Sequence, residues 1–248
     1  MSLRTQLRAS WGLVALNGII PVKRMPLYLV NTLGAPFSFL FFIYVISHGT
    51  LLAFGITGGL VLTVLTAGTG LQSDLTHYRH DLKFQDVVVA SPVEAPVYVI
   101  GMALSELVYS LPGIAVFVVL FVVQGYVTLT SVAIVGGVLL LVWGFATALA
   151  FTLATYFEDV RETFMFSPLI SLVLTVLPPV YYPLAYLPHW AQLVARVSPT
   201  TYAAALVQCS VGIAPSACGS DVLDWGVLVA VTVALLAIAA FKARWKEP

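Results

Sequence analysis

Residues 95–123 read APVYVIGMALSELVYSLPGIAVFVVLFVV and contain one charged side chain, that of Glu106. A helix that crosses the hydrocarbon core of a bilayer, about 30 Å thick, needs about 20 mostly apolar residues, because each residue adds about 1.5 Å. This stretch is longer than that requirement, which allows the helix to tilt or to kink at Pro112. It therefore predicts a transmembrane helix.

Outside this stretch the chain keeps the same character. Of its 248 residues, 60% are hydrophobic and only 9% are charged, whereas a soluble domain carries about 25% charged residues. The chain has too few charges to surround an apolar core, so the fold class is all-α and integral to the membrane. Residues 25–248 form one transmembrane domain of six spans. The other five are 27–47, 51–71, 129–156, 164–182 and 225–241.

The distribution of basic residues orients these spans. Six spans place both termini on one side, and of the eleven Lys and Arg residues only Arg196 falls on the other side. Basic residues stay in the cytoplasm. We therefore expect a multi-pass protein of the cytoplasmic membrane with both termini inside, loops 72–94 and 157–163 inside, and the segment 183–224 outside. The basic residues assigned to the inside are Arg4, Arg8, Lys23, Arg24, Arg79, Lys83, Arg161, Lys242, Arg244 and Lys246.

Residues 1–24 predict a helix that lies in the membrane interface. Arg4 and Arg8 would face the head groups, and Lys23 and Arg24 mark the membrane edge. The side chains expected to face lipid are Leu3, Leu7, Trp11, Leu13 and Val14. The alternative is a signal peptide with WGLVALNGII as its apolar region, but Asn17 and Gly18 interrupt that region and no small-x-small cleavage site precedes Pro21.

The loop 73–92, SDLTHYRHDLKFQDVVVASP, is a polar island between apolar spans. Leu75, Tyr78 and Leu82 follow helical spacing, Ser73 can cap the start, and Pro92 ends the pattern. The loop predicts a short amphipathic helix at the membrane surface, the alternative being a solvated connector.

The same loop carries His77, His80 and Asp81, at a spacing that could suit a metal. Two histidines and one carboxylate are a weak signal, and we predict no metal site.

Within this loop the run from His80 to Pro92, HDLKFQDVVVASP, resembles the first cytoplasmic loop of type-2 ATP-binding cassette (ABC) transporter permeases. That family shows a basic–acidic pair, Gly-Thr, an acidic residue, two apolar residues and Thr/Ser-Pro. Lys83 and Phe84 replace the Gly-Thr. The matching residues are His80, Asp81, Asp86, Val88, Val89, Ser91 and Pro92.

A second stretch, 177–208, resembles the same family more closely. It reads LPPVYYPLAYLPHWAQLVARVSPTTYAAALVQ. The family shows Gly-aromatic-Pro, then Leu-Pro, an aromatic residue, an apolar helix and Pro-x-Thr-Tyr. Pro179 stands where the family often has Gly, and Gln208 where it often has Arg. With the six-span layout and the N-terminal helix, the resemblance extends over nearly the whole chain. The matching residues are Pro183, Leu187, Pro188, Trp190, Pro199, Thr201 and Tyr202.

The chemistry of this second stretch agrees with short re-entrant helices on the external side. Pro178 and Pro179 break the fifth span, and the segment after them is apolar but too interrupted to cross the bilayer. A loop lying on the outer surface is the alternative. The aromatic residues expected at the interface are Tyr181, Tyr182, Tyr186, Trp190 and Tyr202.

The resemblance implies a permease subunit of an ABC exporter. In such exporters the first cytoplasmic loop is a coupling helix that docks on a separate ATPase subunit, and two permease chains work with two ATPases. The implied contacts are Asp81, Lys83, Phe84 and Asp86. A secondary contact is the loop YFEDVRE (156–162), through Glu158, Asp159, Arg161 and Glu162, unless that loop is a solvated connection. Cargoes of the family include drugs, lipids and glycans.

Motifs for other chemistry are missing from the sequence. There is no G-x-x-x-x-G-K-[ST] phosphate loop, and no Ser-His-Asp or Cys-His arrangement. We therefore expect no enzyme activity and no bound cofactor in this chain, with ATP and Mg²⁺ on the partner ATPase. The net charge is zero, so nucleic acid is not an expected partner, whereas membrane lipids are.

Three further residues have a candidate role. Glu106 either lines a transport pathway or pairs with a partner subunit, because an acid within a span usually faces the bundle interior or water; alternatively, it lies near the cytoplasmic interface. Cys209 and Cys218 both fall in the external segment, where an oxidising medium permits a disulfide, the alternative being two buried thiols.

Two other function classes compete with the exporter. A secondary transporter or channel without an ATPase predicts a relay of ionisable residues or an inverted repeat, and only Glu106 fits. An intramembrane enzyme would need acids, His or Ser clustered at one depth, which the sequence does not show.

Overall fold

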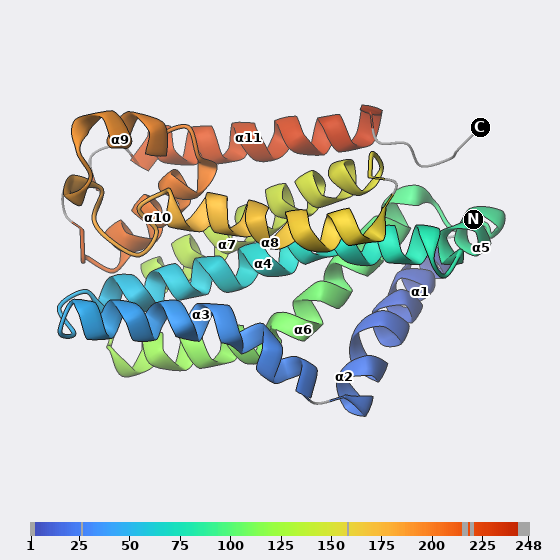
Figure 1. Cartoon of the computed structure of the whole chain (residues 1–248), viewed down its shortest axis with the longest axis horizontal. Coiled ribbons are helices and arrows are strands. Elements are labelled where there is room, and N and C mark those ends of the chain that lie inside the picture. Colours follow the sequence, from blue (N-terminus) through green and yellow to red (C-terminus); the bar gives the residue numbers. More distant parts are fainter. Residues whose placement is uncertain (1–2, 26, 158, 215–217, 219–220, 243–248) are drawn as a thin grey trace.

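The computed structural model describes residues 3–25, 27–157, 159–214, 218 and 221–242, and the regular structure within these ranges is helical, with no strand. This confirms the all-α prediction. The long helices run side by side along the length of the molecule (Figure 1). They are α3 (Leu27–Ile46), α4 (Leu52–His80), α6 (Ala95–Val123), α7 (Leu129–Ala154), α8 (Val160–Val176) and α11 (Asp221–Lys242). The short ones are α1 (Leu3–Val14), the π-helix η1 (Ala15–Ile19), α2 (Ile20–Arg24), α5 (Phe84–Ala90), the 3₁₀-helix η2 (Leu184–Tyr186), α9 (His189–Ala195) and α10 (Pro199–Ser210).

Four of the described helices, α4, α6, α7 and α11, are long and apolar enough to cross a membrane. The bounds of α6 agree with the predicted span 95–123, and this helix continues through Pro112. In α3 the described apolar stretch is shorter, Leu33–Ile46, and α8 has 17 residues. These helices make the chain a multi-pass membrane protein.

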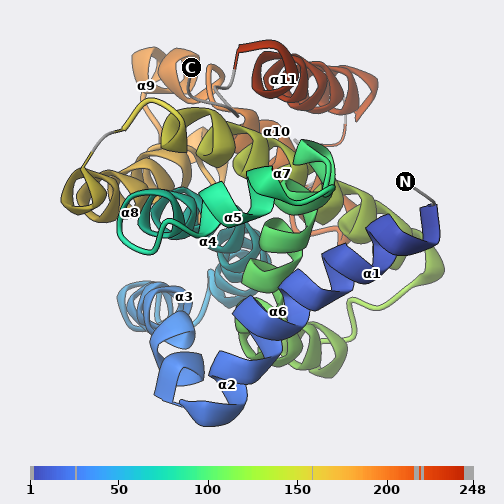
Figure 2. The same cartoon turned by 90° about the vertical axis from the view of Figure 1, so that its right-hand side faces the viewer.

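Helix α4 forms the centre of the bundle. In its most apolar window 83% of the residues are buried, and it packs against α3, α6, α7 and α8 (Figure 2). Two glycines allow this close packing: a Cβ at Gly59 would lie 2.1 Å from the ring of Phe117, and one at Gly68 would lie 2.5 Å from the Cβ of Ala146. Small residues let apolar helices approach each other closely in a membrane.

The two ends of the bundle carry different short helices. Helix α5 and the connection between α7 and α8 lie at the same end as α1, while α9 and α10 lie at the opposite end (Figure 1). The start of α1 and the end of α11 share one end, as expected for an even number of crossings.

The N-terminal helices pack on α6 rather than lying free. Leu7 and Trp11 are exposed, as predicted for side chains that face lipid, but Leu13 and Val14 are buried. The prediction that these last two face lipid is wrong, because they pack against the first half of α6. Tyr109 on α6 donates its hydroxyl hydrogen to the carbonyl oxygen of Asn17, which joins the two segments further.

The second span is longer than predicted. The prediction that Ser73 begins a separate surface helix is wrong, because α4 continues without a break to His80. Its last turns are packed: Leu75 is buried, and the Ser73 hydroxyl donates to the carbonyl oxygen of Thr163 on α8 at 3.3 Å. The surface helix is therefore shorter and begins at Phe84.

Candidate functional site

The corner between α4 and α5 holds most of the residues predicted to contact an ATPase. His77 Nδ1 lies 2.7 Å from Asp81 Oδ2, which closes the last turn of α4. Lys83 then adopts a left-handed backbone with φ of 53°. This is the position at which the resembling family has Gly, the residue that adopts this conformation most readily. The backbone here is therefore one that Gly adopts readily, although Lys occupies the position.

Helix α5 packs inward through Phe84 and the buried Val88 and exposes other residues. Phe84 is partly buried, with ring centroids 5.6 Å from Tyr78 and 6.4 Å from Tyr98. Asp86 and Val87 are exposed in the same helix. Asp86 lies in the first turn, where a negative charge is favoured by the helix dipole. Phe84 thus positions α5, and Asp81, Lys83 and Asp86 are available to a partner.

The connection between α7 and α8, the predicted secondary contact, lies against this corner. Asp159 caps α8 by accepting a hydrogen bond of 2.8 Å from the backbone nitrogen of Arg161. A surface pocket is lined by His80 and Asp81 from one segment and by Asp159, Val160 and Arg161 from the other. Two segments far apart in the sequence therefore meet, and we call these segments, 80–87 and 159–162, the coupling surface because the sequence predicts that they contact an ATPase. Glu158 lies outside the described residues, and Glu162 follows on the exposed first turn of α8.

Metal binding finds no support at this surface. In the ranges that the structure describes, no group of three or more His, Cys, Asp and Glu side chains is placed to hold a metal ion. His77 is instead engaged with Asp81.

At the other end the prolines fix the helix boundaries. Helix α8 ends at Val176, before Pro178 and Pro179, as predicted. Pro183 precedes η2, Pro188 precedes α9, and Pro199 is the first residue of α10, where its missing N–H costs no hydrogen bond. The Tyr202 hydroxyl donates to the carbonyl oxygen of Arg196 at 2.7 Å, and Trp190 is 70% exposed on α9.

The non-helical backbone after α8 is satisfied by side chains from α10. Gln208 donates from Nε2 to the carbonyl oxygens of Pro179 and Val180, at 3.2 and 3.4 Å. The Thr200 hydroxyl donates to the carbonyl oxygen of Leu174. These contacts give partners to carbonyl oxygens near and after the end of α8.

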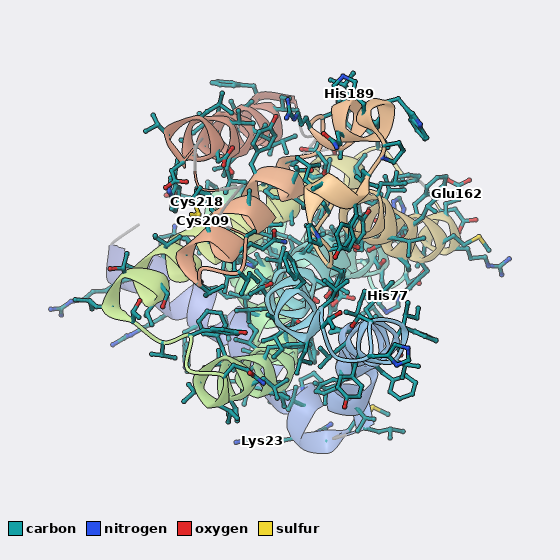
Figure 3. All side chains as sticks on the ribbon, turned by 90° about the vertical axis from the view of Figure 1, so that its left-hand side faces the viewer. Lys23, His77, Glu162, His189, Cys209 and Cys218 are labelled. Carbon is teal, nitrogen blue, oxygen red and sulfur yellow. A yellow bond between two sulfur atoms is a disulfide. The ribbon has the colours of Figure 1, made fainter. Side chains whose placement is uncertain are left out.

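The two cysteines are joined. A disulfide connects Cys209, in α10, to Cys218, and both lie at the α10 end of the molecule (Figure 3). Nearby, a cavity of about 540 Å³ is lined by residues that include Gln192, Arg196 and the buried Asp224.

A second, smaller cavity contains the two acids in the middle of the chain. It has a volume of about 260 Å³ and is lined from α3, α4, α6 and α8. Glu106 on α6 and Asp74 on α4 both line it. Glu106 is 9% exposed and therefore faces the bundle interior, as one of the sequence interpretations expects.

Residues 12–210 match the family model described as "ABC-2 type transporter". The chain belongs to the ABC-2 type transporter family. No curated protein matches it. As an ABC-2 type transporter it is a multi-pass membrane protein of the ABC permease type, and its family works with an ABC ATPase. The matched region extends from the end of α1 to the last residue of α10.

In this ABC-2 type transporter, sequence reasoning finds Glu106 but misses Asp74. The pattern of charges places Asp74 in a surface loop, whereas the residue is partly buried on α4 and lines the cavity. One signal points to this position: Thr66, Gly70 and Asp74 recur at a spacing of one helical turn, and all three line the cavity.

Proposed function

We propose that this chain is the membrane-spanning permease subunit of an ATP-driven ABC exporter. Its energy comes from a separate ATPase subunit, and its cargo is a drug, a lipid or a glycan-type molecule. The observation that carries the proposal is the coupling surface, because the two segments expected to contact an ATPase meet at one end of the bundle.

Mechanical coupling follows from how α5 is attached. Helix α4, which is central and buried, ends at His80, and α5 follows after a short turn. Phe84 packs between Tyr78 of α4 and Tyr98 of α6, so α5 is fixed to both helices. A displacement of α5 by an ATPase would therefore be passed to the two helices instead of being absorbed by a slack loop.

The chain itself would not hydrolyse ATP. It has no phosphate-loop motif, so in this proposal ATP and Mg²⁺ bind the partner ATPase, and the chain holds no cofactor and is no enzyme.

We further propose six spans with both termini in the cytoplasm. The two extra spans are α3 and α8, which lie lengthwise beside α4. Arg79, Lys83 and Arg161 are at the coupling end and Arg196 at the other, which supports a cytoplasmic coupling surface. In this arrangement η2, α9 and α10 are re-entrant helices on the external side.

A second permease chain would complete the pathway. Helices α3 and α8 both carry large apolar side chains on their outer sides. A second copy of this chain, or a related permease, would cover these faces. The two chains together would then surround the transport pathway. The exposed side chains include Phe41 and Phe42 of α3, and Phe164, Met165 and Leu169 of α8.

Co-purification with a co-expressed ABC ATPase from the same organism tests the proposal. Asp86→Lys reverses a charge at the coupling surface and should abolish retention of the ATPase. Asp221→Lys makes the same change on an exposed acid at the other end of the bundle and should leave retention unchanged. Equal retention by both variants would contradict the assignment of the surface.

Transport in vesicles separates the proposal from its main rival. Cargo movement that needs ATP supports the exporter, whereas movement driven by an ion gradient without nucleotide would identify a secondary transporter or channel. The buried pair of acids is the feature that such a rival would use.

A further inference from the structure

Asp74 and Glu106 both line the cavity between α3, α4, α6 and α8. Two carboxylates in one small buried cavity repel each other, so one of the two groups keeps its proton. The pair therefore carries at most one negative charge.

No cationic side chain shares the cavity with this charge. Among the described residues that line it, none is Lys, Arg or His. His77, one turn further along α4, lies outside this lining: it contacts Asp81 at 2.7 Å and attracts Asp74 only from a longer distance. Glu106 is buried, and its Oε1 atom has no hydrogen-bond partner among the described residues. A buried ionisable group within a membrane is normally paired, and an unpaired one marks a functional site.

We propose that this acid pair binds the positively charged group of an organic monocation, an ammonium or guanidinium group, and that the cargo carries this group. A guanidinium or ammonium group can donate to Glu106 Oε1 and neutralises the single charge of the pair. This assignment to the cargo rests on the proposed export function, whereas the binding itself does not.

The size and lining of the cavity select an organic cation over a metal ion. Two carboxyl groups are too few to replace the hydration shell of a metal, which needs about six or more oxygen ligands for Mg²⁺ or Ca²⁺. The volume of about 260 Å³ leaves room for an organic body beside the charge. That body would lie against Ala67, Pro36 and the aromatic rings of Tyr109 and Phe164.

The cavity can be reached from outside the chain. Ala35 of α3 and Phe164 of α8 line it and are both exposed, so its opening lies between these two helices. This is also the side that the proposed second permease would cover. A cation could therefore enter from the shared pathway without unfolding the bundle.

Equilibrium dialysis with radiolabelled phenethylamine tests the site, using the full chain in neutral phosphatidylcholine nanodiscs. The neutral analogue phenethyl alcohol measures the part of the binding that does not depend on the charge of the ligand. The wild type should bind the amine at least tenfold more tightly than the alcohol. In the double variant Asp74→Asn/Glu106→Gln the two should bind equally. Each single variant keeps one carboxyl group that can ionise, so its preference for the amine over the alcohol should be intermediate.

Asp86→Asn is the matched control, because it removes an exposed acid from the coupling surface. It should keep the preference for the amine while losing ATPase retention, so failure of the export proposal and failure of the cation site are distinguishable. A wild type without preference, or a double variant that retains it, would overturn the proposal.

A second readout needs no variant, in case the double variant does not fold. Dicyclohexylcarbodiimide modifies protonated carboxyl groups in apolar surroundings, and mass spectrometry locates the adduct. Modification of Asp74 or Glu106 should be suppressed by phenethylamine and not by phenethyl alcohol. Modification that the amine leaves unchanged would contradict the site.

Discussion

Arg79 donates from its Nη1 atom to the carbonyl oxygen of Thr155, 3.3 Å away and 76 residues later in the chain. This contact joins the end of α4 to the end of α7 and holds the following turn beside the coupling surface. Together with the contact between Ser73 and Thr163, this side chain holds the two segments that the proposed ATPase would contact.

Replacement of Arg79 by Met should weaken coupling. Hydrogen bonds to charged groups contribute about 1.5–3 kcal/mol, so loss of this contact frees the α7–α8 connection. We expect cargo-stimulated ATPase activity of the reconstituted complex to fall at least several-fold. Arg79→Lys, which keeps the charge and one donor, should retain more of the stimulation. Equal stimulation in wild type and Arg79→Met would show that the contact is not needed for coupling.

Gly59 and Gly136 provide a matched pair for helix packing. A Cβ at Gly59 would meet the buried ring of Phe117, whereas a Cβ at Gly136 would have no neighbour within 4 Å. Gly59→Ala should lower stability by about 1–3 kcal/mol, the usual cost of overpacking. Gly136→Ala should leave it unchanged or raise it by up to about 1 kcal/mol, since Ala favours a helix. Thermal unfolding in detergent measures both, and a similar loss in the two variants would argue against the packing described.

Gln208 is expected to support the irregular backbone after α8. Gln208→Leu leaves the carbonyl oxygens of Pro179 and Val180 without these donors, which should cost about 1–3 kcal/mol. Gln208→Arg should retain most of the stability, because a guanidinium group can donate to both oxygens. If thermal unfolding gave the same midpoint for Leu and Arg at this position, the role assigned to the side chain would be incorrect.

Cysteine labelling in intact cells tests the orientation. In a background with Cys209→Ser and Cys218→Ser, a cysteine is placed at Val87 of α5 or at Val222 of α11, both of which are exposed. A membrane-impermeant maleimide should label Val222→Cys in intact cells, and Val87→Cys only after permeabilisation. The opposite pattern would reverse the proposed topology and remove the coupling surface from the cytoplasm.

The sequence predicts a long helix well where its apolar run ends at charged or turn-forming residues. The bounds of α6 are correct because Pro96 and the Gln124–Gly125 turn mark its ends. By contrast, the predicted end of the second span is wrong, because Ser73 and Asp74 look like the start of a new helix when only the local sequence is considered. Ser73 contacts Thr163 of α8, and Asp74 shares a cavity with Glu106 of α6, so apart from the four-residue spacing of Thr66, Gly70 and Asp74 these tertiary relationships leave no local signal.

The site residues likewise divide into those that the sequence predicts and those that depend on tertiary contacts. The family pattern places Asp81, Lys83 and Asp86 at a cytoplasmic loop, and they lie at an exposed corner. Phe84 cannot be separated from them by pattern, although it packs inward against Tyr78 and Tyr98. The cavity itself arises from four helices, so it could not be predicted from any one segment.

Asp74 and Glu106 lie on the two arms of one hairpin, and α5 is its bend. Spreading or closing that hairpin alters the gap between the two carboxyl groups directly, with no intervening element to relay the change. In the proposed exporter, the affinity of the acid pair for a cation would then change during the nucleotide cycle. Capture and release of the cation would need no separate gate.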